Sequence, residues 1–140
     1  MLRVGERLTA HLHGAAVGAG IEMAAFAATV TATDDLRVAL PEVAMGLVPG
    51  AGGTVSMPPR IGRQRTAWLA LTGRTIDAEQ ARELNLVTWV VARNEIDAFV
   101  GDLTRRLAAG PPVALAQTKA LLNEGADRTM RDALANEARA

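Results

Sequence analysis

The 140-residue sequence contains no cysteine, so it can form no disulfide or thiolate metal site and has no cysteine nucleophile. Tyrosine is also absent, and aromatic residues make up only 3% of the chain. Because single-stranded nucleic acids are bound largely by stacking their bases on aromatic rings, a base-stacking surface is not expected. The missing residue types therefore exclude thiol chemistry and argue against base stacking.

An excess of charge of either sign is missing as well. The 15 basic and 15 acidic side chains give a formal net charge of zero, and Lys119 is the single lysine. A neutral chain lacks the long-range field that draws proteins to nucleic acids or to anionic lipids. We therefore expect neither a nucleic acid nor a membrane as a partner.

Long apolar runs are also lacking. The stretch from residue 8 to residue 33 is poor in charge, but it is rich in Ala, Gly and Thr, and Glu22 interrupts it. A membrane-spanning helix needs about 20 predominantly apolar residues, and a signal peptide needs an unbroken apolar centre. Neither is expected, and the sequence predicts a soluble, cytoplasmic protein.

The residues that are present predict alternating strands and helices. Apolar and β-branched runs predict short strands at residues 8–12, 29–33, 37–40 and 87–91. Helical periodicity predicts one helix that begins at Gly18 and five more over residues 62–71, 78–84, 95–108, 112–122 and 131–140. Asp77 is a good N-cap for the third of these, and a glycine-rich loop is expected at residues 45–53. The pattern indicates an α/β protein.

Two glutamates stand out because they are isolated in apolar surroundings. Glu22 is the only charged residue between Arg7 and Asp34, and Glu42 is the only one between Arg37 and Arg60. Neither segment offers a nearby cation, and glutamates are seldom buried without a partner. A carboxyl group among apolar residues holds its proton more readily than one in water, which suits general acid–base catalysis. The alternative is an ordinary solvent-facing or helix-start carboxylate.

Two glycine loops, two histidines and three arginines have simpler interpretations. Gly18–Gly20 and Gly50–Thr54 could bind an anion through backbone N–H groups, but both fail the dinucleotide-binding pattern and neither is a P-loop. His11 and His13 lack a third ligand for a metal site. The arginine cluster is expected to lie on a solvated face or to contact a phosphate or a subunit; it comprises Arg60, Arg63 and Arg65.

Several ordered motifs together resemble one enzyme family. They are GAAVGAGIEMA at residues 14–24, LPEV at 40–43, GLVPGAGGT at 46–54, LTGR at 71–74 and DAEQA at 77–81. In this order and spacing they resemble the crotonase superfamily (enoyl-CoA hydratase/isomerase), and the likeness extends over most of the chain.

The resemblance implies a fold, a substrate class and an assembly. The fold is a crotonase-like ββα spiral, of which residues 1–91 would be a partial core with both glutamates and residues 92–140 a helical region that is incomplete at its end. Members bind acyl-CoA thioesters and commonly form trimers or hexamers, so an acyl-CoA partner and a homo-oligomer are implied. Coenzyme A enters as part of the substrate, and neither a cofactor nor a metal is implied.

The resemblance also implies roles for single residues. By this likeness Glu22 helps to activate a water molecule, and Glu42 delivers a proton to C2 of the substrate. The backbone N–H of Ala19 matches one of the two donors that stabilise the thioester enolate. The matching substrate-binding positions are Gly18, Gly20, Pro41 and Gly50.

The implied activity is that of an enoyl-CoA hydratase, a lyase of the type used in β-oxidation of fatty acids. It adds water in the syn sense to a 2-trans-enoyl-CoA and gives a 3-hydroxyacyl-CoA. Many isomerases of the family lack one glutamate, so the presence of both favours a hydratase. An isomerase, another crotonase-type acyl-CoA enzyme and a non-catalytic truncated paralogue that acts through oligomerisation are the alternatives.

The length of the chain qualifies this expectation. The catalytic domain of the family is close to twice as long, and the match falls on its later part. The first oxyanion donor and much of the coenzyme A surface would then precede Met1, and the end of the helical region would follow Ala140. With half of an oxyanion hole, we expect slow or no hydration by this chain.

Overall fold

The protein is described here by a computed structural model that covers residues 9–125 and 128–139. The chain forms two compact units, Met1–Ile96 and Asp97–Ala140. The first contains strands and helices and the second contains helices, which confirms the α/β class and the C-terminal helical region. Leu8 and Ala140, the ends of the expected first strand and last helix, lie outside the described residues.

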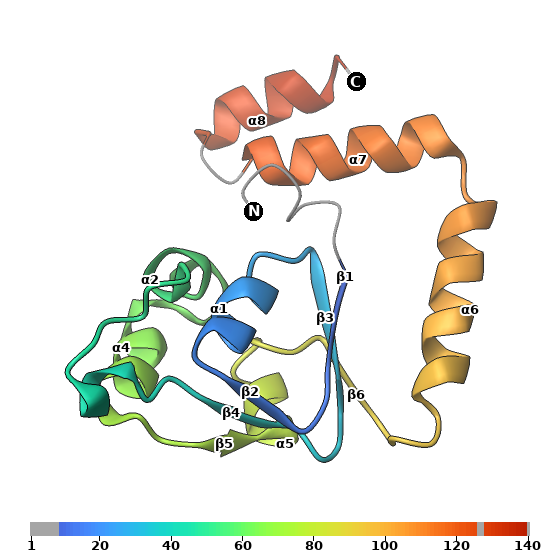
Figure 1. Cartoon of the computed structure of the whole chain (residues 1–140). Coiled ribbons are helices and arrows are strands. Elements are labelled where there is room, and N and C mark those ends of the chain that lie inside the picture. Colours follow the sequence, from blue (N-terminus) through green and yellow to red (C-terminus); the bar gives the residue numbers. More distant parts are fainter. Residues whose placement is uncertain (1–8, 126–127, 140) are drawn as a thin grey trace. The chain divides into compact units, whose positions relative to one another are not determined.

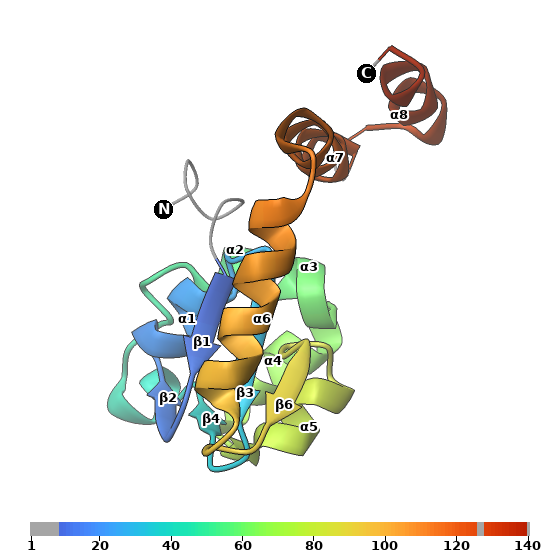
Figure 2. The same cartoon turned by 90° about the vertical axis from the view of Figure 1, so that its right-hand side faces the viewer.

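The strands of the first unit form two small sheets. One sheet is parallel and has the order β1 (Thr9–Leu12), β3 (Thr29–Thr33), β6 (Trp89–Val91) (Figure 2). The other has the order β2 (Ala15–Val17), β4 (Arg37–Ala39), β5 (Ile76–Asp77), with β5 antiparallel to β4. Parallel pairing needs a crossover connection between the paired strands, and in this unit the crossovers include helices.

The first four strands alternate between the two sheets, which gives this part of the chain a spiral course. The chain passes from β1 to β2 and then into helix α1 (Ala19–Ala24), and it returns to the first sheet as β3 before it enters the second as β4 (Figure 1). The register is regular, because Thr31 is paired with His11 on one side and with Trp89 on the other. The ββα turn that the sequence predicts is therefore present.

Short helices follow β4 and pack on the sheets. After a 3-10 turn at Glu42–Met45, the helices are α2 (Gly53–Ser56), α3 (Pro58–Ile61), α4 (Arg63–Thr72) and α5 (Ala78–Glu83). Helix α4 ends at Gly73, whose φ of 63° favours glycine. Helix α5 begins with a capping box in which Asp77 and Gln80 each accept a hydrogen bond from the other's backbone N–H, so the predicted N-cap is confirmed.

A continuous apolar core holds this unit together. Its largest fully buried apolar side chains include Ile21, Val30, Leu36, Val38, Leu40, Met57, Leu69, Ile76 and Leu86. They come from α1, from both sheets, from α4 and from the segments that precede α3 and β6. Helices and both sheets therefore share one core. Burial of such a side chain contributes ~1.5–3 kcal/mol, and this energy positions α1 and the loops around it.

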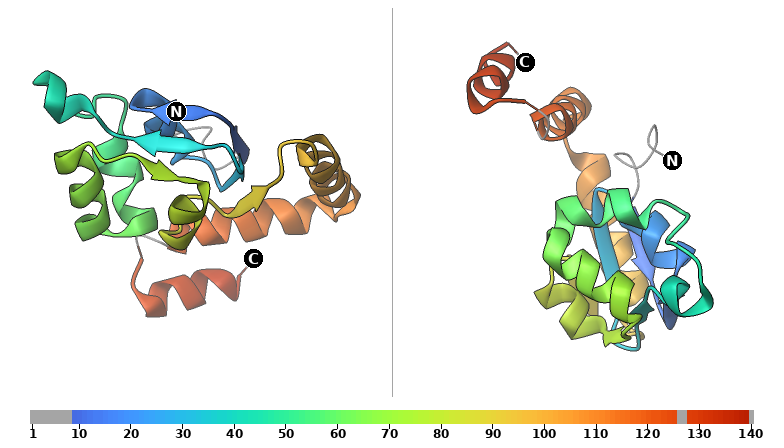
Figure 3. Two further views of the ribbon diagram at one scale, coloured as in Figure 1. Left: turned by 90° about the horizontal axis from the view of Figure 1, so that it is seen from below. Right: turned by 90° about the vertical axis from the view of Figure 1, so that its left-hand side faces the viewer.

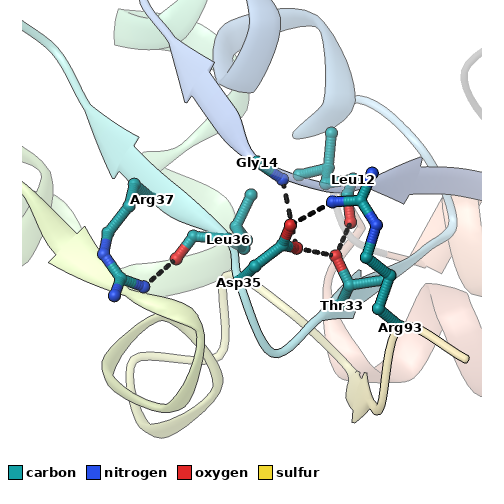
Figure 4. Close-up of polar contacts among 7 residues, drawn as sticks. All are labelled: Leu12, Gly14, Thr33, Asp35, Leu36, Arg37 and Arg93. Atoms are coloured by element: carbon teal, nitrogen blue, oxygen red, sulfur yellow. Dashed lines mark hydrogen bonds and ion pairs between the residues drawn. The ribbon is translucent and has the colours of Figure 1, made fainter.

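A polar cluster joins the turns that follow β1 and β3 (Figure 4). Asp35 accepts hydrogen bonds from the Thr33 hydroxyl and the Gly14 N–H, and it forms an ion pair with Arg93. The Thr33 hydrogen bond, with the Gly14 N–H and Arg93, lowers the pKa of Asp35 to about 2. The cluster fixes the turns between β1 and β2 and between β3 and β4.

The second unit consists of α6 (Ile96–Ala109), α7 (Pro112–Gly125) and α8 (Met130–Glu137). Helices α7 and α8 run antiparallel side by side (Figure 3), and Glu124 accepts hydrogen bonds from Arg128 and Asn136. The apolar stripe predicted for α6 is present, but none of its described residues is buried. In the part of the chain that the structure covers, no helix has the length and apolarity required to span a membrane.

Candidate active site

Glu22 is buried and held by backbone donors. Glu22 lies in α1 and is only 1% exposed to solvent, yet it forms no ion pair in the described part of the chain. Instead, Oε2 accepts the N–H groups of Ala51 and Gly53, each at 2.8 Å. A hydrogen bond from a backbone N–H to a carboxylate is about twice as strong as one between two neutral groups. The partner of this glutamate is therefore the glycine-rich loop before α2.

Glycine is required where this loop approaches the carboxylate. A Cβ at Gly53 would lie 2.7 Å from Cγ of Glu22 and 3.1 Å from its Oε2. Gly52 has a φ of 108°, and a Cβ there would lie 2.7 Å from the ring of Phe26. The loop N–H groups can reach Glu22 because these two positions carry no side chain.

Glu42 lies at the start of the 3-10 turn and points towards Gly18. A Cβ at Gly18 would collide with Oε1 of Glu42, and Gly18 has a φ of 55°. The other oxygen, Oε2, is buried and has no hydrogen-bond partner among the described residues. A buried carboxyl oxygen without a partner is costly in a folded protein, which is typical of a group kept for chemistry or for a ligand.

Ala19 is the first residue of α1, the helix that carries Glu22. Its N–H belongs to the first helical turn, in which N–H groups have no acceptor within the helix. The preceding residue, Gly18, donates to the Ala39 carbonyl at 2.9 Å and accepts the Glu22 N–H at 3.1 Å. Ala19 therefore directly follows the glycine that Glu42 approaches and lies on the same helix as Glu22.

The remaining predicted positions surround this centre. Gly20 lies within α1 with open space beside it, so a side chain there would meet no described atom within 4 Å. Pro41 directly precedes Glu42 and is half-buried, and its Cα would lie 3.6 Å from a Cβ at Gly73. Gly50 is exposed and directly precedes Ala51, the residue that binds Glu22. The structure therefore brings the predicted residues into one region of the first unit.

The two histidines lie outside this region. His11 and His13 are exposed, and the centres of their rings are 6.5 Å apart. Within residues 9–125 and 128–139, no group of three or more His, Cys, Asp or Glu side chains is arranged to hold a metal ion.

The sequence interpretation missed the residues that hold Glu22 and α1. Ala51 and Gly53 act through backbone N–H groups, and the only sequence signal for them is the glycine cluster itself. Arg60 was expected on a solvated face or in a phosphate or subunit contact, but its Nε donates to the Ala25 carbonyl at 2.5 Å and its side chain is half-buried. Arg63 and Arg65 are exposed, as a solvated face requires.

This arrangement can move protons beside a developing negative charge. Oε1 of Glu22 makes no hydrogen bond to the described part of the chain, so it can accept a proton. The unpartnered oxygen of Glu42 can donate one from a second direction. The N–H of Ala19 at the start of α1 can stabilise an oxyanion, and such donors are worth ~10²–10³ in kcat.

Known proteins have similar sequences and a similar fold. A family model described as enoyl-CoA hydratase/isomerase matches residues 3–140. The 2,3-dehydroadipyl-CoA hydratase of Escherichia coli is 32% identical over 93% of this chain and 51% of its own length. The short-chain-enoyl-CoA hydratase of Clostridium acetobutylicum is 30% identical over 94% of this chain and 50% of its own length. The chain thus spans about half the length of these curated relatives.

Solved structures agree. A Thermobifida fusca protein in complex with acetoacetyl-CoA has a TM-score of 0.89 and 35% identity over 94% of this chain and 51% of its own. An enoyl-CoA hydratase from Mycobacterium smegmatis has a TM-score of 0.90 and 28% identity over 99% of this chain and 55% of its own. These matches confirm the predicted resemblance and the crotonase-like fold. The chain belongs to the enoyl-CoA hydratase/isomerase family, the crotonase superfamily.

Proposed function

We propose that this chain carries the acid–base centre of an enoyl-CoA hydratase. The substrate is a 2-trans-enoyl-CoA, and syn addition of water gives a 3-hydroxyacyl-CoA. The observation that carries the proposal is the pair of carboxyl groups at helix α1: Glu22 on the helix is bound to two backbone donors, and Glu42 approaches its N-cap, Gly18, with a buried free oxygen. Family membership and the acetoacetyl-CoA bound in a structural relative support a thioester substrate.

Each residue has one role in the reaction. Glu22 accepts a proton from water as the water oxygen forms a bond to C3. The electron pair of the double bond moves towards the thioester oxygen, where the Ala19 N–H stabilises the enolate. Protonated Glu42 then transfers its proton to C2 as the thioester carbonyl forms again. The proton on Glu22 returns to Glu42 through solvent, so one water is added and both groups are restored.

The reaction requires no cofactor, because coenzyme A is part of the substrate. The substrate-binding positions are Gly18, Gly20, Pro41 and Gly50. We propose the cytoplasm as the site of action, on the basis of the acyl-CoA substrate, and cell fractionation with an antibody to the chain tests it.

A homo-oligomer, a trimer or hexamer, is the proposed assembly. Its support is the exposure of large apolar side chains that follow Glu42, which are 44–75% exposed: Val43, Met45, Leu47 and Val48. Patches of this kind commonly mark interaction surfaces. Light scattering that gives the mass of a single chain at micromolar concentration would contradict this assembly.

Product analysis tests the proposed reaction and separates it from its alternatives. The purified chain is incubated with a 2-enoyl-CoA and, separately, with the matching 3-enoyl-CoA, and the thioesters are separated by chromatography. We expect 3-hydroxyacyl-CoA from the 2-enoyl substrate above the buffer rate. Conversion of 3-enoyl to 2-enoyl thioester without hydration would assign an isomerase. Oligomers that bind no acetoacetyl-CoA in calorimetry would indicate a non-catalytic role.

A further inference from the structure

Helix α1 is too short to hold Glu22 in place by itself. It has six residues, Ala19–Ala24, whereas isolated helices shorter than ~12–15 residues are marginal in water. The position of the Glu22 carboxyl group therefore depends on contacts from outside the helix. Four hydrogen bonds to Glu22 and to the C-cap residue Ala25 come from one segment, residues 51–60.

Ser56 binds the backbone of the residue whose side chain acts in the proposed reaction. Its hydroxyl donates to the carbonyl oxygen of Glu22 at 2.9 Å, and both residues are buried, with Ser56 5% exposed. Buried carbonyl oxygens normally accept a hydrogen bond, and this hydroxyl donates one to a carbonyl of α1 from outside the helix. Ser56 thus holds the main chain at Glu22, while Ala51 and Gly53 hold its carboxylate.

Arg60 binds the end of the same helix. Its Nε donates to the carbonyl of Ala25, the C-cap of α1, at 2.5 Å. The carbonyl end of a helix carries partial negative charge, and a cation there is favourable. Burial lowers the pKa of Arg60, and no carboxylate forms an ion pair with it in the described ranges. The partner of the half-buried guanidinium is therefore the carbonyl at the end of α1 and not a carboxylate.

We propose that Ser56 and Arg60 are positioning residues for Glu22. By holding two backbone carbonyls of α1, they keep its carboxylate within reach of the Ala51 and Gly53 N–H groups. A displacement of α1 by about 1 Å would stretch the 2.8 Å contacts beyond hydrogen-bond length. The catalytic consequence rests on the proposed hydratase function, but the structural part of the claim does not.

Nuclear magnetic resonance of the whole 140-residue chain tests the structural part. The amide proton shifts of Ala51 and Gly53 are compared in the wild type, Arg60→Met and Ser56→Ala, with Glu22→Ala as the reference for loss of the carboxylate. We expect both positioning variants to move the two shifts at least half of the way to the Glu22→Ala values. Arg65→Met is the matched control, because Arg65 is exposed, and it should leave both shifts in place.

Kinetics with a 2-enoyl-CoA test the catalytic part. We expect each positioning variant to lower kcat by about tenfold or more with KM changed by less than twofold, because these side chains bind backbone carbonyls at Glu22 and Ala25 and act through Glu22. Circular dichroism confirms that each variant is folded, and if Arg60→Met unfolds, Ser56→Ala decides the question. Unmoved Ala51 and Gly53 shifts in a folded variant would overturn the proposal. Moved shifts in variants that keep the wild-type kcat would refute the catalytic role of Glu22 and leave the positioning role standing.

Discussion

The substitution Gly53→Ala tests most sharply whether the Glu22 carboxylate is held by the N–H groups of Ala51 and Gly53. Gly53 is the first residue of α2, and its φ is not in the left-handed region, so an alanine is tolerated by the backbone itself. The new Cβ, however, would lie 2.7 Å from Cγ and 3.2 Å from Cδ of Glu22. Because Glu22 is 1% exposed, it has little room to move away. The carboxylate must therefore leave its two N–H donors.

The expected cost follows from those two hydrogen bonds. Hydrogen bonds to a charged group contribute ~1.5–3 kcal/mol each, and an alanine regains up to ~1 kcal/mol of backbone entropy and helix propensity. We expect a net loss of ~2–5 kcal/mol in the free energy of unfolding. A base displaced by about 1 Å also costs ~10²-fold in rate, so kcat for hydration should fall by at least this factor.

Urea unfolding and steady-state kinetics measure the two effects. Gly20→Ala is the steric control for stability, because a Cβ there meets no atom within 4 Å and its φ is ordinary. It should unfold at the same urea concentration as the wild type or at a higher one. If Gly53→Ala matched Gly20→Ala in stability and kept the wild-type kcat, the Glu22 carboxylate would not depend on hydrogen bonds to this loop.

Three further predictions concern other groups. Glu42→Gln should lower the hydration rate by ~10²–10⁴ and leave the free energy of unfolding within ~1 kcal/mol, because its buried oxygen has no partner to lose; an unchanged rate would remove its role as the acid. The pKa of Asp35 is lowered from 3.8 to about 2 in the fold. The unfolded chain therefore binds the proton first, and stability from this group is present above pH ~4 and lost as the pH falls towards 2. Urea unfolding against pH should show this loss in the wild type and not in Asp35→Asn. Asp77→Ala removes the capping box of α5 and should cost ~1 kcal/mol in the same assay, whereas an unchanged midpoint would contradict the capping role.

Local signals predicted α1 and the helices from α4 to α8, whereas the four-residue helices α2 and α3 were not predicted. The helix that ends at Gly73 and the helix capped by Asp77 depend on residues within one turn, so the sequence contains the necessary information. Strand β2 was not predicted, because Ala15–Val17 has no alternation and its pairing partner, Arg37–Ala39, lies about twenty residues later. Such short strands are stabilised by pairing and not by local preference.

The chemical residues of the site were identified more completely than their supports. Glu22 and Glu42 are conspicuous because they are the only charges in long apolar segments. The donors to Glu22 are backbone N–H groups 29 and 31 residues further along the chain, and no side-chain pattern marks such donors. Arg60 looks like its exposed neighbours in sequence, and only its contact with α1 distinguishes it.

The most direct test of the central claim is the rate at which the 140-residue chain hydrates crotonyl-CoA, compared between the wild type, Glu22→Gln and Glu42→Gln. The account predicts slow formation of 3-hydroxybutyryl-CoA by the wild type, above the buffer rate, and a fall to the buffer rate in each variant. Hydration by the wild type that is unaffected by either substitution would contradict this assignment of the two glutamates.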